Sequence, residues 1–496
     1  MESPMQSSRF ARYMALVLPA FAAILFLLIN PAGFMGGGGD DYRYLTAARC
    51  WVDGSGFCLP RNHWEARWPT VMPIAATLGL FGESRDTLGI APLLFWISAL
   101  VLIGWLGRLW FDRATGLVAA ALFSALPIFT LSALQPNADN VELVFQLGAL
   151  CLATIAYKHQ SRWSALLAGL LAAIACQARE TSFIFCLVAA LSWLTLPREQ
   201  RRTLLYAIPG FVAGIAAEML IYAISTGDAA LRYRLALQHS AVYSTELAPT
   251  VDTARSALLN PDFIAGWKRE MGIHIWWPID PWLNLLASPQ LGTFVILAGT
   301  MAILVRKDVP GPWKDHLKWA AVFAALAAAL LVYVLAVDPK SRMFLLVAVV
   351  ATLTSAVTLV TAWRNSRRVL AACVVAMICL VAVPTMKSRA DPRPFESSAR
   401  QWIAMQGGTI EIDRATQTVL TLVPEANRLP LQGSGKPMYL AIGGRGCRQL
   451  VQPQAGSPQL AHVVKTAGDE GSAQLCLLRY SDAGRAAFTR RSIAAP

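Results

Sequence analysis

Acidic side chains at the start of the chain are the first residues of this sequence that are suited to chemistry. An apolar run at 13–34 is followed by four glycines and then by Asp40-Asp41-Tyr42-Arg43-Tyr44. Partly dry surroundings raise the pKa of a carboxyl group and a neighbouring cation lowers it, so an Asp here is a candidate general base. The alternative is a solvated helix start, where acids favour the positive end of the helix dipole.

A second acidic group lies in the short polar stretch from Gln135 to Glu142. Asp139 fits two roles, a functional acid or a simple N-cap of the helix that follows. Glu142 lies about one turn further into the apolar run, where an ionisable side chain is expensive and needs a partner. Glu142 therefore favours the functional interpretation.

Arginines occur at similar boundaries, as Arg67, Arg179 and Arg342. Arg179 either neutralises its neighbour Glu180 or holds an anion. Arg342 either holds an anion or extends its guanidinium to the membrane interface. The planar fork of arginine suits phosphate. A lipid-phosphate leaving group needs charge stabilisation and an attacking hydroxyl needs a base, so these residue types fit sugar transfer from a lipid phosphate. Composition alone does not exclude a transporter.

The elements that position these residues are apolar helices. The 496 residues are 55% hydrophobic and 15% charged, with mean hydropathy +0.47, whereas soluble domains carry about 25% charged residues. The first apolar run is too long for a signal peptide and predicts a retained helix. Eleven apolar stretches predict an α-helical polytopic membrane protein, with ten spans as the alternative if the two short runs at 163–177 and 181–196 are one helix. The stretches are 13–34, 88–107, 114–134, 141–157, 163–177, 181–196, 203–225, 283–305, 317–337, 343–363 and 368–386.

Basic clusters favour eleven spans. With a cytoplasmic N-terminus, every even connection is basic, as the positive-inside rule requires. The net charge of +13 is therefore explained by membrane topology rather than by nucleic-acid binding, for which the sequence has no motif. The clusters are Arg9 and Arg12; Arg108 and Arg113; Lys158 and Arg162; Arg198, Arg201 and Arg202; Arg306, Lys307, Lys314 and Lys318; and Arg364, Arg367 and Arg368.

The odd connections then face outward, notably the loops 36–87 and 226–282. The second loop carries the basic and aromatic residues Arg232, Arg234, His239, Tyr243 and Trp276-Trp277. Its aromatic residues either border a sugar pocket or anchor at the membrane interface, and anchoring is expected for the tryptophans. We expect a membrane domain over 1–386 and a small outward-facing α/β or β-rich domain over 387–496. The tail has short alternating runs at Thr409–Asp413, Val419–Val423 and Met438–Ile442.

Four of the nine cysteines lie in outward-facing segments. Cys50 and Cys58 share the first outer loop, and Cys447 and Cys476 share the tail. Disulfides persist in an oxidising compartment, so each pair is a candidate disulfide, with free thiols as the alternative.

These motifs, in this order, resemble the GT-C membrane glycosyltransferases, in the branch of the protein O-mannosyltransferases and the lipid A aminoarabinose transferase. That branch has Asp-Glu-x-Arg-Tyr after its first helix, and Asp40 to Tyr44 keeps the Asp, Arg and Tyr. Gly56 to Arg61 and then Glu65-Ala66-Arg67-Trp68-Pro69 stand where the family has Gly-x-x-x-Pro-Arg and Glu-Lys-Pro-Pro. Asp139, Arg179 in 177–181 and Arg342 in 341–344 match later family positions. The resemblance covers about 10–360.

The resemblance implies a GT-C bundle and an inverting sugar transfer from a polyprenyl-phosphate donor at the outer face of a bacterial inner membrane. Asp40 would be the base, and Asp41 or Asp139 would orient the acceptor or Asp40. Arg43, Arg67, Arg179 and Arg342, with Tyr44, would bind the donor, supported by Glu65, Glu142 and Glu180. The acceptor would be a glycolipid, a polysaccharide or a protein.

Some family members use a metal ion, but no two of the six histidines show ligand spacing. No metal is therefore assigned, and a divalent ion held through oxygen by Asp40, Asp41 or Asp139 stays open as the alternative. Three other functions remain open. They are a flippase or transporter of lipid-linked sugars, a ligase or oligosaccharyltransferase with a diphosphate-linked donor, and a non-catalytic scaffold, which would not explain acids and arginines at one membrane face.

Overall fold

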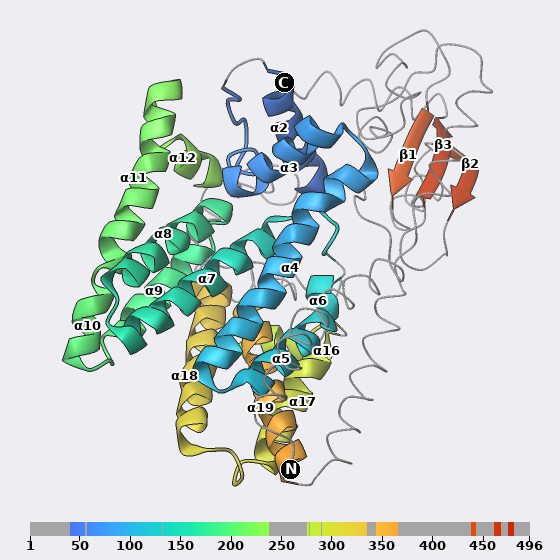
Figure 1. Ribbon diagram of the computed structural model, residues 1–496. Helices are drawn as coiled ribbons and strands as arrows, with labels where there is room; N and C mark the ends of the chain where they lie inside the picture. The colour runs from blue at the N-terminus through green and yellow to red at the C-terminus, as the bar shows by residue number, and fades with distance from the viewer. Residues whose placement is uncertain are drawn as a thin grey trace.

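The computed structural model describes residues 40–54, 57–130, 132–237, 275–276, 278–288, 290–334, 344–365, 438–442, 461–467 and 475–480. These residues form a bundle of helices and one small sheet (Figure 1). The predicted first span at 13–34 and last span at 368–386 lie outside the described residues. The total of eleven spans therefore stays a prediction.

Helices occupy every predicted apolar run between 88 and 363. Within the described residues, five helices are long and apolar enough to cross a membrane, or up to six if the pair α16 and α17, bent by 93°, is one span. The helices are α2 (Asp40–Val52), α3 (Trp68–Phe81), α4 (Arg85–Trp110), α5 (Arg113–Ser124), α6 (Pro127–Thr130), α7 (Ala138–His159), α8 (Arg162–Ala178), α9 (Ser182–Trp193), α10 (Arg198–Leu204), α11 (Ala207–Thr226), α12 (Leu231–Leu237), α16 (Asp280–Ala287), α17 (Gly292–Leu304), α18 (Gly311–Ala329), the π-helical turn η1 (Leu330–Val334) and α19 (Leu345–Arg364).

Polar N-caps start four of these helices. In each, a side-chain oxygen accepts a hydrogen bond from the backbone N–H three residues later, which satisfies one of the unpaired donors at a helix start. The capping residues are Ser84 for α4, Asp112 for α5, Asn137 for α7 and Ser161 for α8. The interpretation of Asp139 as an N-cap is therefore wrong, since Asn137 takes that position.

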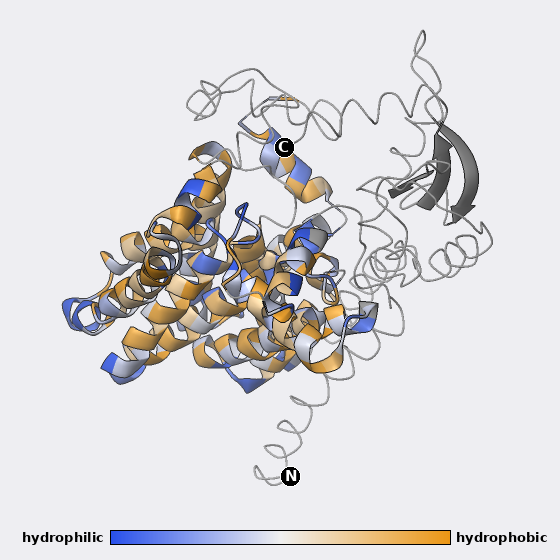
Figure 2. Ribbon diagram, turned by 90° about the horizontal axis from the view of Figure 1, so that it is seen from above, coloured by the Kyte–Doolittle hydropathy of each residue, from blue (hydrophilic) through white to orange (hydrophobic). Residues whose placement is uncertain are grey.

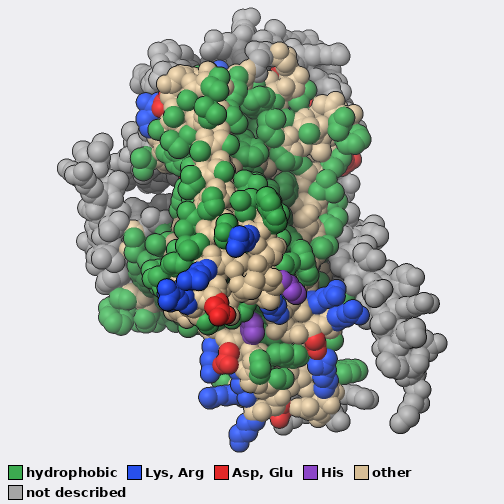
Figure 3. All heavy atoms as spheres, turned by 60° about the vertical axis from the view of Figure 1, so that its left-hand side comes forward, with side chains coloured by type: hydrophobic (Ala, Val, Ile, Leu, Met, Phe, Trp, Pro, Cys, Tyr) green, Lys and Arg blue, Asp and Glu red, His purple; other side chains and the backbone are tan. Residues whose placement is uncertain are grey.

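The predicted cytoplasmic connections meet at one end of the bundle, called here the basic end. Arg364 at the end of α19 pairs with Asp112 at the start of α5, at 2.6 Å. The Lys158 ammonium group donates to the carbonyl of Leu109. Figure 3 shows Lys and Arg side chains gathered at the lower end, below a broad hydrophobic surface. This is the pattern expected of a bundle whose apolar belt faces lipid.

The runs at 163–177 and 181–196 form two helices rather than one continuous span. Thr203 of α10, beyond α9, donates to Gln160 before α8 at 2.5 Å, so α9 returns to the basic end where α8 began. The break at Arg179–Thr181 lies at the opposite end, called here the site end. This result supports the predicted alternation of sides.

Glycines let α8 and α11 approach closely. A Cβ atom on Gly169 of α8 would lie 1.8 Å from the carbonyl oxygen of Ala207, and one on Gly210 of α11 would lie 2.0 Å from that of Leu166. Such small residues drive helix association where lipid offers no hydrophobic gain. Many large apolar side chains face outward instead, and Figure 2 shows hydrophobic residues dominating the bundle helices.

The first outer loop is constrained by a disulfide bond. A disulfide joins Cys50 at the end of α2 to Cys58, with Cα atoms 5.8 Å apart. It ties α2, which begins at Asp40, to the turn that leads to Arg67. Cys447 lies outside the described residues, so its pairing with Cys476 stays a prediction.

Three strands are described in the tail. β1 (Met438–Ile442), β2 (Ala461–Ala467) and β3 (Leu475–Tyr480) form an antiparallel sheet in the order β1-β3-β2, with Leu440 opposite Leu477. The predicted alternating run Met438–Ile442 is β1. The type and extent of the C-terminal domain stay predictions.

We expect Gly169→Ala to lower the thermal unfolding temperature, because the new methyl group meets the Ala207 carbonyl. Overpacking of this kind costs about 1–3 kcal/mol. The matched control is Gly299→Ala in α17, where a Cβ atom has no neighbour within 4 Å. Thermal unfolding in nanodiscs measures both variants. Equal unfolding temperatures for Gly169→Ala and wild type would contradict the close α8–α11 packing.

Candidate active site

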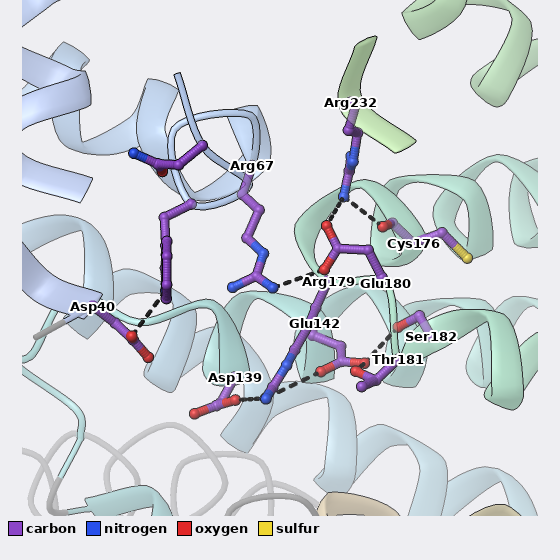
Figure 4. Close-up of polar contacts among 12 residues, drawn as sticks. Asp40, Arg67, Asp139, Glu142, Cys176, Arg179, Glu180, Thr181, Ser182 and Arg232 are labelled. Atoms are coloured by element: carbon purple, nitrogen blue, oxygen red, sulfur yellow. Dashed lines mark hydrogen bonds and ion pairs between the residues drawn. The ribbon is translucent and has the colours of Figure 1, made fainter. Parts of the chain in front are cut away.

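Three segments that are distant in sequence meet at the site end. They are the first outer loop, the start of α7 and the break between α8 and α9. In Figure 4 the side chains of Asp40, Arg67, Asp139 and Arg179 converge from these segments. The acids begin helices because carboxylates favour the positive helix start, and the arginines stand in turns. The site is thus built from helix ends.

Asp40 is the first residue of α2 and is partly exposed. The indole N–H of Trp64 donates to its Oδ1 at 2.8 Å. The Arg43 guanidinium lies 3.6 Å from the centroid of a Trp64 ring, which is cation–π geometry. Asp41 is only 3% exposed. Asp40 is therefore oriented by a neighbour yet reachable, and it also lies in the first turn of α2, as the alternative of an acidic helix start predicts.

Arg67 is buried in the turn before α3 and makes two polar contacts to side chains. Its Nη1 donates to the Tyr44 hydroxyl at 3.0 Å, and its Nη2 donates to Glu180 at 2.7 Å. Its Nε is also buried and has no hydrogen-bond partner among the described residues. One donor of the guanidinium therefore remains for a ligand.

Glu180 is bound by two arginines. Arg67 contacts Oε2, and Arg232 of α12 contacts Oε1 at 3.2 Å. Burial by itself would raise the pKa of Glu180, but the charges of Arg67 and Arg232 lower that pKa far below its ordinary value. Burial would likewise lower the pKa of Arg67, but Glu180 and Tyr44 raise it. Both ends of the Arg67–Glu180 pair are therefore charged at neutral pH.

Tyr44 is fully buried between these groups. Burial raises the pKa of its phenol, and the nearby charge of Asp40 acts in the same direction, against the lowering effect of Arg67. The phenol therefore keeps its proton at neutral pH. Because its oxygen accepts from Arg67, its own O–H remains able to donate to an acceptor.

Arg232 and Glu218 extend the cluster, and neither was assigned a role from the sequence. Arg232 Nη1 donates to Glu218 Oε1 at 2.7 Å, and Nη2 donates to the carbonyl of Cys176 at 2.8 Å. Glu218 is the only charged residue of α11. A lone acid inside an apolar helix needs a buried partner. This signal in the sequence identifies Glu218 as a candidate for a buried ion pair.

Arg179 pairs with acids of α7 rather than with Glu180. It forms an ion pair with Asp139 and lies 3.9 Å from Glu142. The interpretation of Arg179 and Glu180 as a mutually neutralised pair is wrong, because each faces a different partner. Both acids and Arg179 are largely buried.

Glu142 is held by several donors. Thr181 and Ser182 donate to its Oε1 at 2.8 and 2.7 Å, and Gln146 does so at 3.1 Å. A cavity of about 30 Å³ lies beside this group. Glu142, Gln146, Arg179 and Thr181 form its polar lining, and apolar side chains of α9, α18, η1 and α19 form the rest.

Two other predicted site residues do not join the cluster in the described structure. Glu65 accepts from the backbone N–H of Arg61 and from the Asn62 side chain, both at 2.7 Å, and so stabilises its own turn. Arg342 lies outside the described residues. Within those residues no three His, Cys, Asp or Glu side chains are grouped to hold a metal ion, so we assign none.

Known proteins share this fold. A family model, dolichyl-phosphate-mannose-protein mannosyltransferase, matches residues 71–225. The apo oligosaccharyltransferase of Archaeoglobus fulgidus aligns with TM-score 0.56 and 12% identity, over 86% of this chain and 65% of its own. This chain thus spans about two thirds of that enzyme.

ArnT of Cupriavidus metallidurans, solved with undecaprenyl phosphate, aligns with TM-score 0.54 and 12% identity, over 96% of this chain and 98% of its own. No curated protein matches the sequence. The family model matches one continuous part of the chain, and the two solved structures show a fold that this chain shares at 12% identity.

Proposed function

We propose that this protein moves a sugar from a polyprenyl-phosphate donor to a hydroxyl group of an envelope acceptor, with inversion at the anomeric carbon. The single observation that carries the proposal is the meeting of a partly exposed carboxylate, Asp40, with a buried guanidinium, Arg67, around Tyr44. A base for the acceptor and a cation for the leaving group are what this reaction needs.

Arg67 is our first choice for the lipid phosphate. Its planar fork suits a phosphate oxygen pair, and its buried Nε has no partner within the described residues. Arg179 faces two carboxylates, whereas Arg67 faces one. Arg43 lies over the Trp64 ring and remains a candidate. Arg342 remains a fourth candidate.

The proposed reaction is one displacement. Asp40 takes the proton of the acceptor hydroxyl as its oxygen attacks the anomeric carbon from the face opposite the phosphate. The carbon–oxygen bond to the phosphate breaks, and both electrons leave with the phosphate. Arg67 and the Tyr44 hydroxyl stabilise the new charge, and the proton passes from Asp40 to solvent. Asp139 would orient the acceptor side through its pairing with Arg179.

The setting we propose is a bacterial inner membrane, with the site end and the 387–496 domain in the periplasm. The undecaprenyl phosphate of the ArnT structure supports a donor of the same class. The acceptor is a glycolipid, a polysaccharide or a protein. The fold likeness to an oligosaccharyltransferase keeps a diphosphate-linked donor as the second candidate.

Asp40→Asn should lower sugar transfer about 10²–10⁴-fold, the range for loss of a general base. The amide oxygen can still accept from Trp64, so donor binding should persist. Purified protein is assayed with synthetic polyprenyl-phosphate and diphosphate sugars and with extracted envelope acceptors. The control is Asp53→Asn, an exposed acid of the same outer loop.

Equal transfer by Asp40→Asn and wild type would remove Asp40 as the base. Transfer from diphosphate donors alone would favour the ligase or oligosaccharyltransferase function. Lipid movement without transfer, unaffected by Asp40→Asn, would favour a flippase.

Arg67→Lys should raise the KM for the donor about tenfold, which corresponds to about 1.4 kcal/mol. A single ammonium group keeps the charge but cannot reproduce the fork of donors. Arg61→Lys, at an exposed arginine of the same loop, is the matched control. An unchanged donor KM in Arg67→Lys would show that Arg67 does not hold the phosphate.

A further inference from the structure

The carboxylate of Glu180 is divided between two arginines. Arg67 forms an ion pair with Oε2 at 2.7 Å, and Arg232 forms one with Oε1 at 3.2 Å (Figure 4). Arginine and a carboxylate favour two parallel hydrogen bonds when nothing competes. Here Arg232 occupies the second oxygen, so Arg67 binds Glu180 through a single nitrogen.

Arg232 is fixed by groups other than Glu180. Glu218 accepts from its Nη1 at 2.7 Å, and the Cys176 carbonyl accepts from its Nη2 at 2.8 Å. Arg232 is 1% exposed and Glu218 is 3% exposed, so water does not compete for these contacts. Arg232 is therefore anchored to α8 and α11, while Arg67 belongs to the outer loop.

The single contact to Glu180 has a consequence for Arg67. Its Nη1 reaches the Tyr44 hydroxyl at 3.0 Å, and its Nε has no partner among the described residues. A two-bond pair with Glu180 would engage Nε or Nη1 in addition to Nη2, and so would remove a donor from the lipid phosphate or from Tyr44. The backbone before Arg67 is held separately, because the Tyr222 hydroxyl donates to the Ala66 carbonyl at 3.4 Å.

We propose that Arg232, with Glu218 as its charge partner, is a positioning residue for donor binding. By holding one oxygen of Glu180, Arg232 keeps the Arg67 fork turned toward Tyr44 and the lipid phosphate. Glu218 balances the charge of Arg232. This inference rests on the role of Arg67 under the proposed function, and neither member of the pair touches the substrate.

A variant that tests this role must keep the net charge of the cluster unchanged. Arg67 and Arg232 face Glu180 and Glu218, two cations with two anions. Loss of Arg232 alone would leave a buried carboxylate without its cation, which destabilises proteins strongly. The double change Arg232→Gln with Glu218→Gln removes one charge of each sign and leaves Arg67 alone with Glu180.

We expect this double variant to bind undecaprenyl phosphate about tenfold more weakly, equivalent to about 1.4 kcal/mol, and to show a similar rise in donor KM with kcat little changed. The single variant Glu218→Gln keeps Arg232 on Glu180 and should bind the lipid as well as wild type or better. Binding is measured in nanodiscs by intrinsic tryptophan fluorescence, and folding by the thermal unfolding temperature.

A folded double variant with wild-type lipid affinity would overturn the inference, as would equal weakening by Glu218→Gln. The two proposals fail separately. If wild type binds undecaprenyl phosphate but transfers no sugar, the proposed function fails while the binding comparison still decides the positioning role. If transfer occurs but the double variant has the wild-type donor KM, only the positioning role is disproved.

Discussion

Burial of charge at the helix ends is the constraint on which the site depends. Glu180 stands in the three-residue break between α8 and α9 and is bound from two sides, by Arg67 and by Arg232. An unpaired charge there would be costly, so the outer loop, α8 and α12 are held in one arrangement. The same constraint ties the start of α7 to the break through Arg179 and Asp139. The ion pairs are thus both the reason these segments meet and the source of the site's chemistry.

The arrangement also separates two kinds of acid. Glu142 and Asp139 are buried and face Arg179, and Glu180, with a side chain 25% exposed, is bound by two arginines. Asp40 instead accepts from an indole and keeps partial exposure. A carboxylate paired with an arginine is a poor base, whereas a partly exposed carboxylate can be reached by an acceptor hydroxyl. This contrast assigns the paired acids to positioning and Asp40 to proton transfer in the proposed reaction.

Much of the bundle could be predicted from the sequence, because long apolar runs and basic turns are strong signals. Helices lie in each predicted run between 88 and 363, and the break at 179–181 is where composition placed it. Asp139 and Arg179 were predicted on one membrane face, and the structure brings them into contact. The partners of Glu180 could not be predicted, since Arg67 is 113 residues away and Arg232 is 52. Pairing over such separations depends on packing, which periodicity does not encode. The lone acid Glu218 was a readable signal for a buried partner, but the sequence did not identify that partner as Arg232.

The account depends most directly on where the donor phosphate binds. A cryo-electron microscopy structure of the full chain in nanodiscs with undecaprenyl phosphate would locate it. We predict the phosphate within hydrogen-bond distance of the Arg67 guanidinium and the Tyr44 hydroxyl, on the side of the cluster that faces Asp40. Phosphate density elsewhere, for example at the basic end near Arg201 and Arg202, with Arg67 still bound only to Glu180 and Tyr44, would contradict the account.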